Sequence, residues 1–443
     1  MILLKQLTRI SAITCLSLWA LPAQCEEDSF TFSGYVKSYA LAQESISIKA
    51  VDENAPPQSV ASNFQSQNAL RLMSSYLSSD LGNFEVHYEV QPLYFSNAEM
   101  ALYYTDNSFS VIDATISTAS NPYRFKDLDS VLAEVGDHGV ILQNLDRFNY
   151  QYSNQYGDLT IGRQVVSFGS SRFINPTDIF IPFAIQTLNQ EYRVGIDAIR
   201  YKADIGDFAV IDMGVVIGDE AKKENSALFL RAKDSINGND IEAIAILLDE
   251  AWLLGAGLER AIGDFGFWFE TAYMNWQQSP KQQQADHAVD IHETPYTDNY
   301  WRTSVGSDYA LNEEVIVMVE YHYNGAGSSN VQDYATIATQ APYQKAGVYL
   351  YGQHYLIPAV TWLASPLASL SASAFYNVCD HSVFFTLSNE TSWSDNLYSD
   401  FGLYYSYGNP TTYQGQPEQI SYNLGSEFGS YPVSLYASLR YYF

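Results

Sequence analysis

The stretch PVSLYASLRYYF, residues 432–443, decides the fold. Its side chains alternate along the segment, with Val433, Leu435, Ala437, Leu439, Tyr441 and Phe443 on one parity and Ser434, Tyr436, Ser438, Arg440 and Tyr442 on the other. A repeat of two residues places successive side chains on opposite faces of a β-strand. A strand of about ten residues with one face in lipid and the other in water has this pattern. The segment therefore predicts a membrane-crossing strand.

The same alternation recurs along the chain, for example near residues 84–94, 314–324 and 397–407. Counting such segments gives about 18 strands, with about 16 as the alternative. Short turns alternate with longer connections, the longest lying at 43–66, 95–145, 169–194, 277–298 and 408–432. Transmembrane barrels join their strands in this way, whereas a water-soluble sandwich has no reason to do so. We therefore expect an all-β, antiparallel up-and-down transmembrane barrel with a lumen wide enough for an aqueous channel.

The terminal segment also resembles the last strand of Gram-negative outer-membrane barrels, which typically ends on Phe with aromatic or aliphatic residues at alternate positions before it. The resemblance covers about a dozen residues, a length that suits one such strand. It implies that Tyr441 and Phe443 form a membrane-insertion signal for the barrel-assembly machinery. It also implies outer-membrane lipid and lipopolysaccharide as surroundings.

Residues 1–25 have the features of a cleavable export signal. Lys5 and Arg9 precede a short apolar stretch, and small residues at Ala23 and Cys25 suit cleavage after Cys25. Only Cys379 would remain, which excludes a disulfide-stapled fold. No other segment has the roughly 18 consecutive apolar residues of a transmembrane helix. We expect residues 26–443 to form a single barrel domain in the outer membrane.

Charge and composition narrow the function. The chain has 22 Lys and Arg against 50 Asp and Glu, a net charge of −28, and 35 tyrosines. Nucleic-acid binding is not expected, because a phosphate backbone selects a basic surface. The acidic excess falls mainly in the outer connections. It could gather cations at the channel mouth or bind divalent ions that bridge to lipopolysaccharide, or it could be a solvated surface without specific sites.

Strand parity predicts which charged side chains face the lumen. The predicted pore-lining residues are Lys37, Arg71, Glu85, Glu89, Arg147, Arg200, Lys202, Arg231, Lys233, Glu259, Glu270, Arg302, Glu320, Asp400 and Arg440. Such a mixed lining can select solutes by its local field. The alternative is that these side chains form ion pairs that only satisfy one another.

Residues 145–200 resemble a segment of large, mostly uncharacterised proteobacterial porin-like proteins, distantly similar to the alginate-export porins. The resemblance rests on a strand ending in Gly162-Arg163-Gln164, on Phe168-Gly169 and on Asn175-Pro176 with Asp178. The acidic balance of the chain does not favour a polyanion such as alginate, so this solute is not transferred.

The connection at 169–194 is expected to fold into the barrel. Its segment from Ile179 to Ile185 is too apolar for a loop standing in water, and it would narrow the lumen with Arg172, Asn175 and Asp178 as constriction residues. The alternative is that it covers a neighbouring loop at the surface. A bulge at Gly162 is expected to turn Arg163 into the lumen as a further pore-lining residue, since its outward parity would place it in lipid.

These patterns predict an outer-membrane porin that passes small polar solutes or ions passively. The alternative is a non-conducting barrel that acts as an adhesin, receptor or partner-holding scaffold, with the connection at 95–145 as one possible partner site. Catalytic residues, a metal site and cofactors are not expected, because the histidines are scattered without a neighbouring nucleophile or ligand set. The solute, and the choice between monomer and trimer, stay open.

Overall fold

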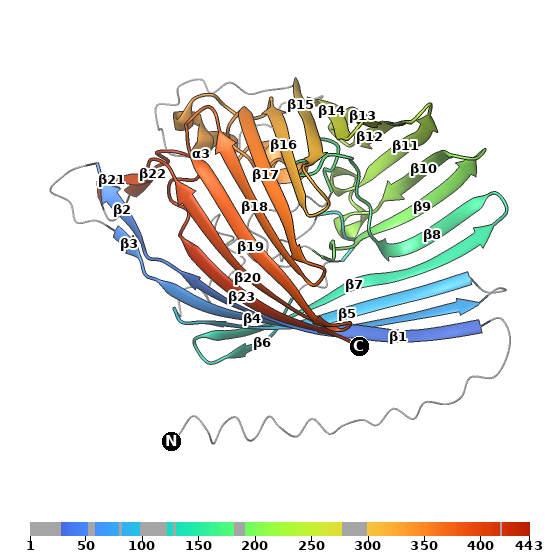
Figure 1. Cartoon of the computed structure of the whole chain (residues 1–443), viewed down its shortest axis with the longest axis horizontal. Helices are drawn as coiled ribbons and strands as arrows, with labels where there is room; N and C mark the ends of the chain where they lie inside the picture. The colour runs from blue at the N-terminus through green and yellow to red at the C-terminus, as the bar shows by residue number, and fades with distance from the viewer. Residues whose placement is uncertain are drawn as a thin grey trace, which may run out of the picture.

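The computed structural model describes residues 28–51, 58–78, 82–97, 122–126, 130–180, 191–276, 299–416 and 419–443. The expected export signal at 1–25, most of the connection at 95–145 and the whole of 277–298 lie outside these residues. Within them the chain forms a closed antiparallel barrel of 18 strands (Figure 1). The expected architecture and the higher of the two strand counts are therefore confirmed.

The barrel strands are β1 (Asp28–Gln43), β4 (Asn63–Ser78), β5 (Gly82–Phe95), β7 (Gly139–Asn154), β8 (Gly157–Gln164), β9 (Ile196–Ile205), β10 (Ala209–Val216), β11 (Ala227–Ile236), β12 (Asn239–Leu248), β13 (Ala251–Ile262), β14 (Phe265–Trp276), β15 (Asn299–Ala310), β16 (Val315–Asn324), β17 (His354–Ser365), β18 (Ala368–Asn377), β19 (Val383–Ser394), β20 (Leu397–Tyr407) and β23 (Ser434–Tyr442). Each pairs with the next, and β1 closes the barrel on β23, with Lys37 opposite Arg440. Closure satisfies the backbone groups that an open sheet edge would expose to lipid.

The remaining elements lie in the longer connections. They are the strands β2 (Ile46–Ala50), β3 (Gln58–Val60), β6 (Ser130–Val135), β21 (Thr412–Gln416) and β22 (Gln419–Asn423), the 3-10 helices η1 (Asp219–Ala221), η2 (Lys223–Asn225) and η3 (Val331–Asp333), and the helices α3 (Tyr334–Ile337) and α4 (Ala341–Lys345). Strands β22, β21, β2 and β3 form a small second sheet, at the left in Figure 1. No helix among the described residues is long and apolar enough to cross a bilayer.

The expected bulge at Gly162 is absent, and that prediction was wrong. The registers of β8 with β7 and with β9 run through Gly162 without a shift. Glycine is needed there for another reason, because its φ is +114° and a Cβ would lie 2.3 Å from the carbonyl oxygen of Phe148. The register shift lies between β5 and β7, where Arg147 pairs with His87 and Leu145 with Tyr88, leaving Asp146 unpaired.

Candidate constriction in the barrel lumen

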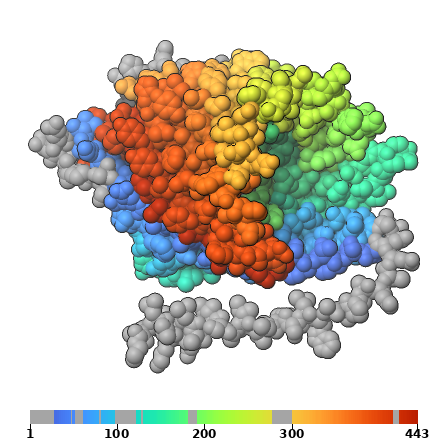
Figure 2. Space-filling view, viewed as in Figure 1, coloured from blue at the N-terminus to red at the C-terminus, as the bar shows by residue number. Residues whose placement is uncertain are grey.

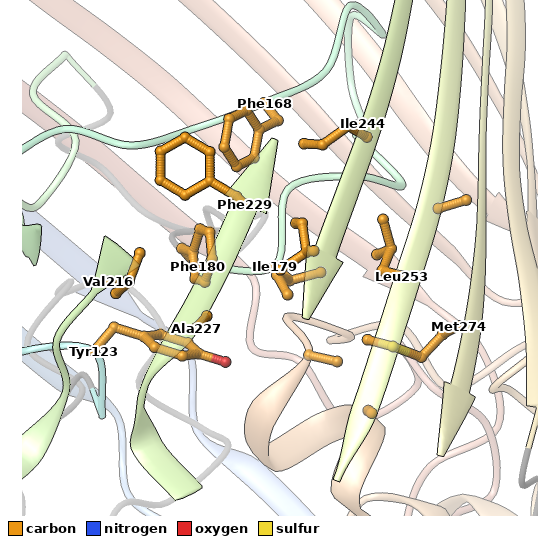
Figure 3. Close-up of a cluster of buried hydrophobic side chains, with 14 of the residues drawn as sticks. Tyr123, Phe168, Ile179, Phe180, Val216, Ala227, Phe229, Ile244, Leu253 and Met274 are labelled. Carbon is orange, nitrogen blue, oxygen red and sulfur yellow. The ribbon is translucent and has the colours of Figure 1, made fainter. Parts of the chain in front are cut away.

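The connection between β8 and β9, residues 165–195, packs against the inner wall of the barrel. We call it the β8–β9 loop; its residues 181–190 lie outside the described ranges. Phe168, Ile179 and Phe180 are each at most 3 % exposed and belong to one buried cluster with inward side chains of β9–β14 (Figure 3). The ring centroids of Phe168 and Phe229 on β11 lie 5.3 Å apart. We call the cluster residues on these strands the apolar wall, because their inward side chains are apolar and buried against the loop.

A buried carboxylate on β14 holds the first segment of this loop. Glu270 is 1 % exposed, and its two oxygens accept hydrogen bonds from the amides of Ser170 (2.8 Å), Ser171 (3.1 Å) and Thr177 (2.9 Å) and from the Thr177 hydroxyl (2.8 Å). Hydrogen bonds to an ionised acceptor are stronger than neutral ones, and they satisfy loop amides that would otherwise be buried without partners. Glu270 therefore positions the loop.

Glu320 on β16 binds the neighbouring loop residues in the same way. It is 0 % exposed and accepts from the amides of Arg172 (3.0 Å), Phe173 (3.3 Å) and Ile174 (2.9 Å) and from the indole nitrogen of Trp268 (2.8 Å). Between them, Glu270 and Glu320 bind six consecutive or nearly consecutive loop residues. The Arg172 side chain itself stays 46 % exposed and pairs with Glu259 at 3.1 Å.

The returning segment of the loop contacts a different sector of the wall. The Glu191 carboxylate lies 2.6 Å from Lys37 Nζ on β1 and accepts a 2.5 Å hydrogen bond from the Tyr442 hydroxyl on β23. Tyr192 packs on Tyr35, with ring centroids 5.5 Å apart. β1 and β23 are far from β14 and β16 in the strand order. The loop thus makes contacts on well-separated sectors of the lumen.

A cluster of arginines lies where the loop rejoins β9. Asp146, left inward by the register shift, pairs with Arg71, with Arg147 at 2.8 Å and with the amide of Gly195 at 2.7 Å. Arg71 also lies 3.6 Å from Glu89. These groups are almost fully buried, so an uncompensated charge among them would be costly and each has an opposite partner.

Other inward charges pair between neighbouring strands. Arg200 binds both oxygens of Asp212, at 2.7 and 2.5 Å, and Arg231 lies 2.6 Å from Glu242. Glu85 lies 3.0 Å from His87 and accepts from Asn149 at 2.9 Å. Mutual pairing, the simpler of the two interpretations of the lining, accounts for these residues.

Register and burial place the predicted site residues as follows. Those on the inner face are Lys37, Arg71, Glu85, Glu89, Arg147, Arg200, Lys202, Arg231, Lys233, Glu259, Glu270, Arg302, Glu320, Asp400 and Arg440. Of the expected constriction residues, Asp178 pairs with Arg193, while Asn175 packs against Gly169. Tyr441 and Phe443 face outward with 47 % and 43 % exposure, and Phe443 exchanges backbone hydrogen bonds with Gly34 on β1.

Arg163 does not stand in an open lumen, contrary to its predicted role. It is 4 % exposed and binds Asp197 at 2.8 Å together with the carbonyl oxygens of Leu145 (2.9 Å) and Lys126 (2.7 Å). Asp197 in turn accepts from the amide of Phe125 at 2.9 Å. The free-energy cost of placing Arg163 on the outward face is thus offset by its ion pair with Asp197, which residues 122–126 cover. No bulge is needed to turn the side chain away from lipid.

Several residues of the site had no clear signal in the sequence. Asp146, Asp212 and Glu242 are inward acids on strands, and Glu191 and Glu427 lie in loops. Asp212 could have been found from its shared parity with Val210 and Val216. The two loop acids have no periodicity to reveal them.

Glu427 joins the last long connection to the barrel. Its carboxylate is 3 % exposed and accepts from the Tyr355 hydroxyl, from Asn377 Nδ2 (2.8 Å) and from the amide of Tyr351 (2.9 Å). Burial raises the pKa of Glu427 to about 7. The adjacent Phe428 belongs to a buried cluster that also contains Ile174 of the β8–β9 loop. Glu427 is therefore next to the buried cluster that packs around that loop.

Among the described residues, no group of three or more His, Cys, Asp or Glu side chains is placed to hold a metal ion. Within the same ranges the ion pairs of the lumen join acids to bases and do not converge on an acid-only site.

No protein-family model matches this sequence, and no curated protein matches it. The fold is similar to that of solved structures. Acinetobacter baumannii OccAB1 matches with a TM-score of 0.51 and 11 % identity over 94 % of this chain and 96 % of that one. OmpT, an outer membrane protein of Vibrio cholerae, matches with a TM-score of 0.39 and 10 % identity over 94 % and 100 %. A Rhodopseudomonas blastica porin mutant matches with 0.41 and 7 % over the same shares. The likeness to OccAB1 concerns the fold alone, and with the closed strand order it shows that this chain has the same kind of closed β-barrel fold.

Proposed function

We propose that the protein is a passive channel for small polar solutes or ions and that the β8–β9 loop forms its constriction. The observation that carries the proposal is the fixation of this loop inside the barrel, by Glu270 and Glu320 on one sector and by Glu191 on another. Because several charge-assisted hydrogen bonds hold the loop in one position, it narrows the lumen permanently and does not move in and out of the solute path. A barrel of this strand number is otherwise wide enough for an aqueous channel.

The lining on the far side of the loop supports passage of water and polar solutes. The inward residues of β17–β19 include small hydroxyls that are only partly buried, namely Thr361, Ser369, Ser371, Ser373, Thr386 and Ser388. We call this set the hydroxyl wall. Figure 2 shows the molecule hollowed between the orange and yellow segments that include β15–β18 and the green and blue segments opposite them. Polar residues around such a hollow suit solutes that keep part of their hydration.

Conductance in planar bilayers tests this function. The purified full chain should give discrete steps, and deletion of residues 172–190 should enlarge them about twofold or more, because electrolyte replaces the loop. The double variant Glu270→Gln and Glu320→Gln should give a smaller increase with more frequent transitions, since it weakens the anchors and leaves the loop in place.

The control is Glu220→Gln, an exposed acid on η1 whose ion pair is with Lys222, outside the loop; this variant should leave the steps unchanged. If neither the full chain nor the deletion variant conducts, the channel function is wrong. A non-conducting barrel that binds a partner through its outer connections would then be the better description.

A further inference from the structure

We propose that Glu191, Glu390 and Asp400, held in place by Arg440 and Lys37, give the channel a preference for cations. This inference rests on the proposed channel function and adds a solute class to it. The five side chains come from the β8–β9 loop, β19, β20, β23 and β1, so they join the loop to the wall at the seam where the barrel closes.

Arg440 is the centre of this group. Its guanidinium lies 2.5 Å from Glu390, 2.7 Å from Asp400 and 3.9 Å from Glu191. Lys37 Nζ lies 2.6 Å from Glu191 and 4.1 Å from the ring centroid of Tyr35. The group therefore contains three carboxylates and two cations, and its formal charge is negative.

Exposure makes the surface offered to a solute more acidic than the count suggests. The side chains of Glu390 and Glu191 are 50 % and 36 % exposed, whereas those of Arg440 and Lys37 are 13 % and 0 % exposed. A hydrated ion can approach the exposed carboxylates more closely than the buried cations, and the interaction energy falls with distance. A passing ion thus meets carboxylates first.

The hydroxyl wall beside this group adds no charge to the field. The hydroxyl wall, whose strands all lie within the described ranges, carries no charged side chain at the inward positions of β19 between Glu390 and Phe384. The inner carboxylates of β14 and β16 are fully buried and are used by loop amides. The inward arginines Arg200 and Arg231 lie on β9 and β11 and are paired with Asp212 and Glu242. Glu390 is opposite Ser369 in the strand register and therefore brings an exposed carboxylate directly beside the hydroxyl wall.

Reversal potentials in a potassium chloride gradient test the inference. We expect the unmodified channel to prefer potassium over chloride. Glu390→Gln should lower the permeability ratio about twofold to fourfold, as expected for removing one charge about 10 Å from the ion path in water. Arg440→Gln should raise it by a similar factor. Both shifts should shrink in about 1 M salt, where screening is strong.

Glu220→Gln removes the same charge from an exposed outer connection and should leave the ratio unchanged. The half-exposed Glu390 can be replaced without opening a cavity, so its variant remains informative if Arg440→Gln fails to fold. A conducting channel that prefers chloride, or in which Glu390→Gln shifts the ratio no more than the control, would overturn the inference and leave the channel function intact. Failure to conduct would instead overturn the channel function.

Discussion

The apolar wall and the hydroxyl wall are two parts of the inner face of this barrel, and they differ in polarity and in burial. On the apolar wall, inward positions hold side chains such as Phe229, Ile244 and Met274, and the β8–β9 loop covers them. On the hydroxyl wall, inward positions hold serine and threonine that are only partly buried, next to a buried cluster with Tyr355, Phe375 and Phe384 on the same strands. One wall is thus a protein core inside the barrel, and the other is a partly exposed polar surface that would line the proposed channel. The difference shows that the inner face of a barrel need not be polar where a loop folds onto it.

The largest expected effect on stability comes from breaking the contact between the β8–β9 loop and the apolar wall. Replacement of Phe168 by Ala removes a buried ring between Phe180 and Phe229 and should destabilise the loop packing by about 3–5 kcal/mol. Bilayer recordings should then show frequent transitions to a larger conductance. The matched control is Phe267→Ala on the outer face, whose ring is 41 % exposed and points away from the loop. Equal behaviour of the two variants would contradict the role given to the apolar wall.

The same contrast explains what could be predicted from the sequence. In β18, the residues ASLSASAF alternate between alanine or leucine and serine, so the strand and its inward face both follow from the pattern. In β12 (NDIEAIAILL), the residues AIAILL from position 243 onward are apolar on both faces, because the loop packs against the inner face. Strand position was still predictable there, but the inward parity of Glu242 was not.

Local geometry set a second limit. Gly162 suggested a bulge, but the register shift occurs at Asp146 on the adjacent strand. Glycine is required at position 162 because a Cβ there would collide with the neighbouring backbone. The anchors Glu270 and Glu320 were predicted to be inward, but their loop partners depend on a fold of residues 170–177 that has no periodicity. Glu191 and Glu427 were missed for the same reason.

The next prediction concerns Glu427, whose titration should make the stability of the buried cluster beside the hydroxyl wall depend on pH. Its pKa is raised from 4.5 to about 7 by burial, so the packed state favours the neutral carboxyl. The packing is therefore most stable below about pH 4.5, weakens as the pH rises toward about 7, and loses roughly 3 kcal/mol in total. Recordings at about pH 5 should show fewer transitions than recordings at about pH 8.

Glu427→Gln provides the control for this titration. The amide keeps the oxygen that accepts from Tyr355 and Asn377 but has no charge to gain. At the higher pH the variant should behave as the unmodified chain does at the lower pH. A pH dependence that persists in Glu427→Gln would assign the titration to another group and contradict the role given to Glu427.

The smallest expected effects on stability come from two single substitutions. One adds a hydroxyl to the apolar wall, and the other removes a hydroxyl from the hydroxyl wall. Ala227 on β11 is 4 % exposed and pairs with Val216 and Leu248, so Ala227→Ser buries a hydroxyl among apolar side chains and should cost about 1–3 kcal/mol of unfolding free energy. Ser373→Ala on β18 removes a 2.7 Å contact with Thr386. Because both groups are only partly buried, water can replace the lost partner, and the change should stay within about 0.5 kcal/mol. Denaturant titrations in detergent compare the two variants directly. If both substitutions lower the unfolding free energy equally, the two walls are hydrated to the same extent. The solute path then cannot be assigned to the side of the loop that faces the hydroxyl wall.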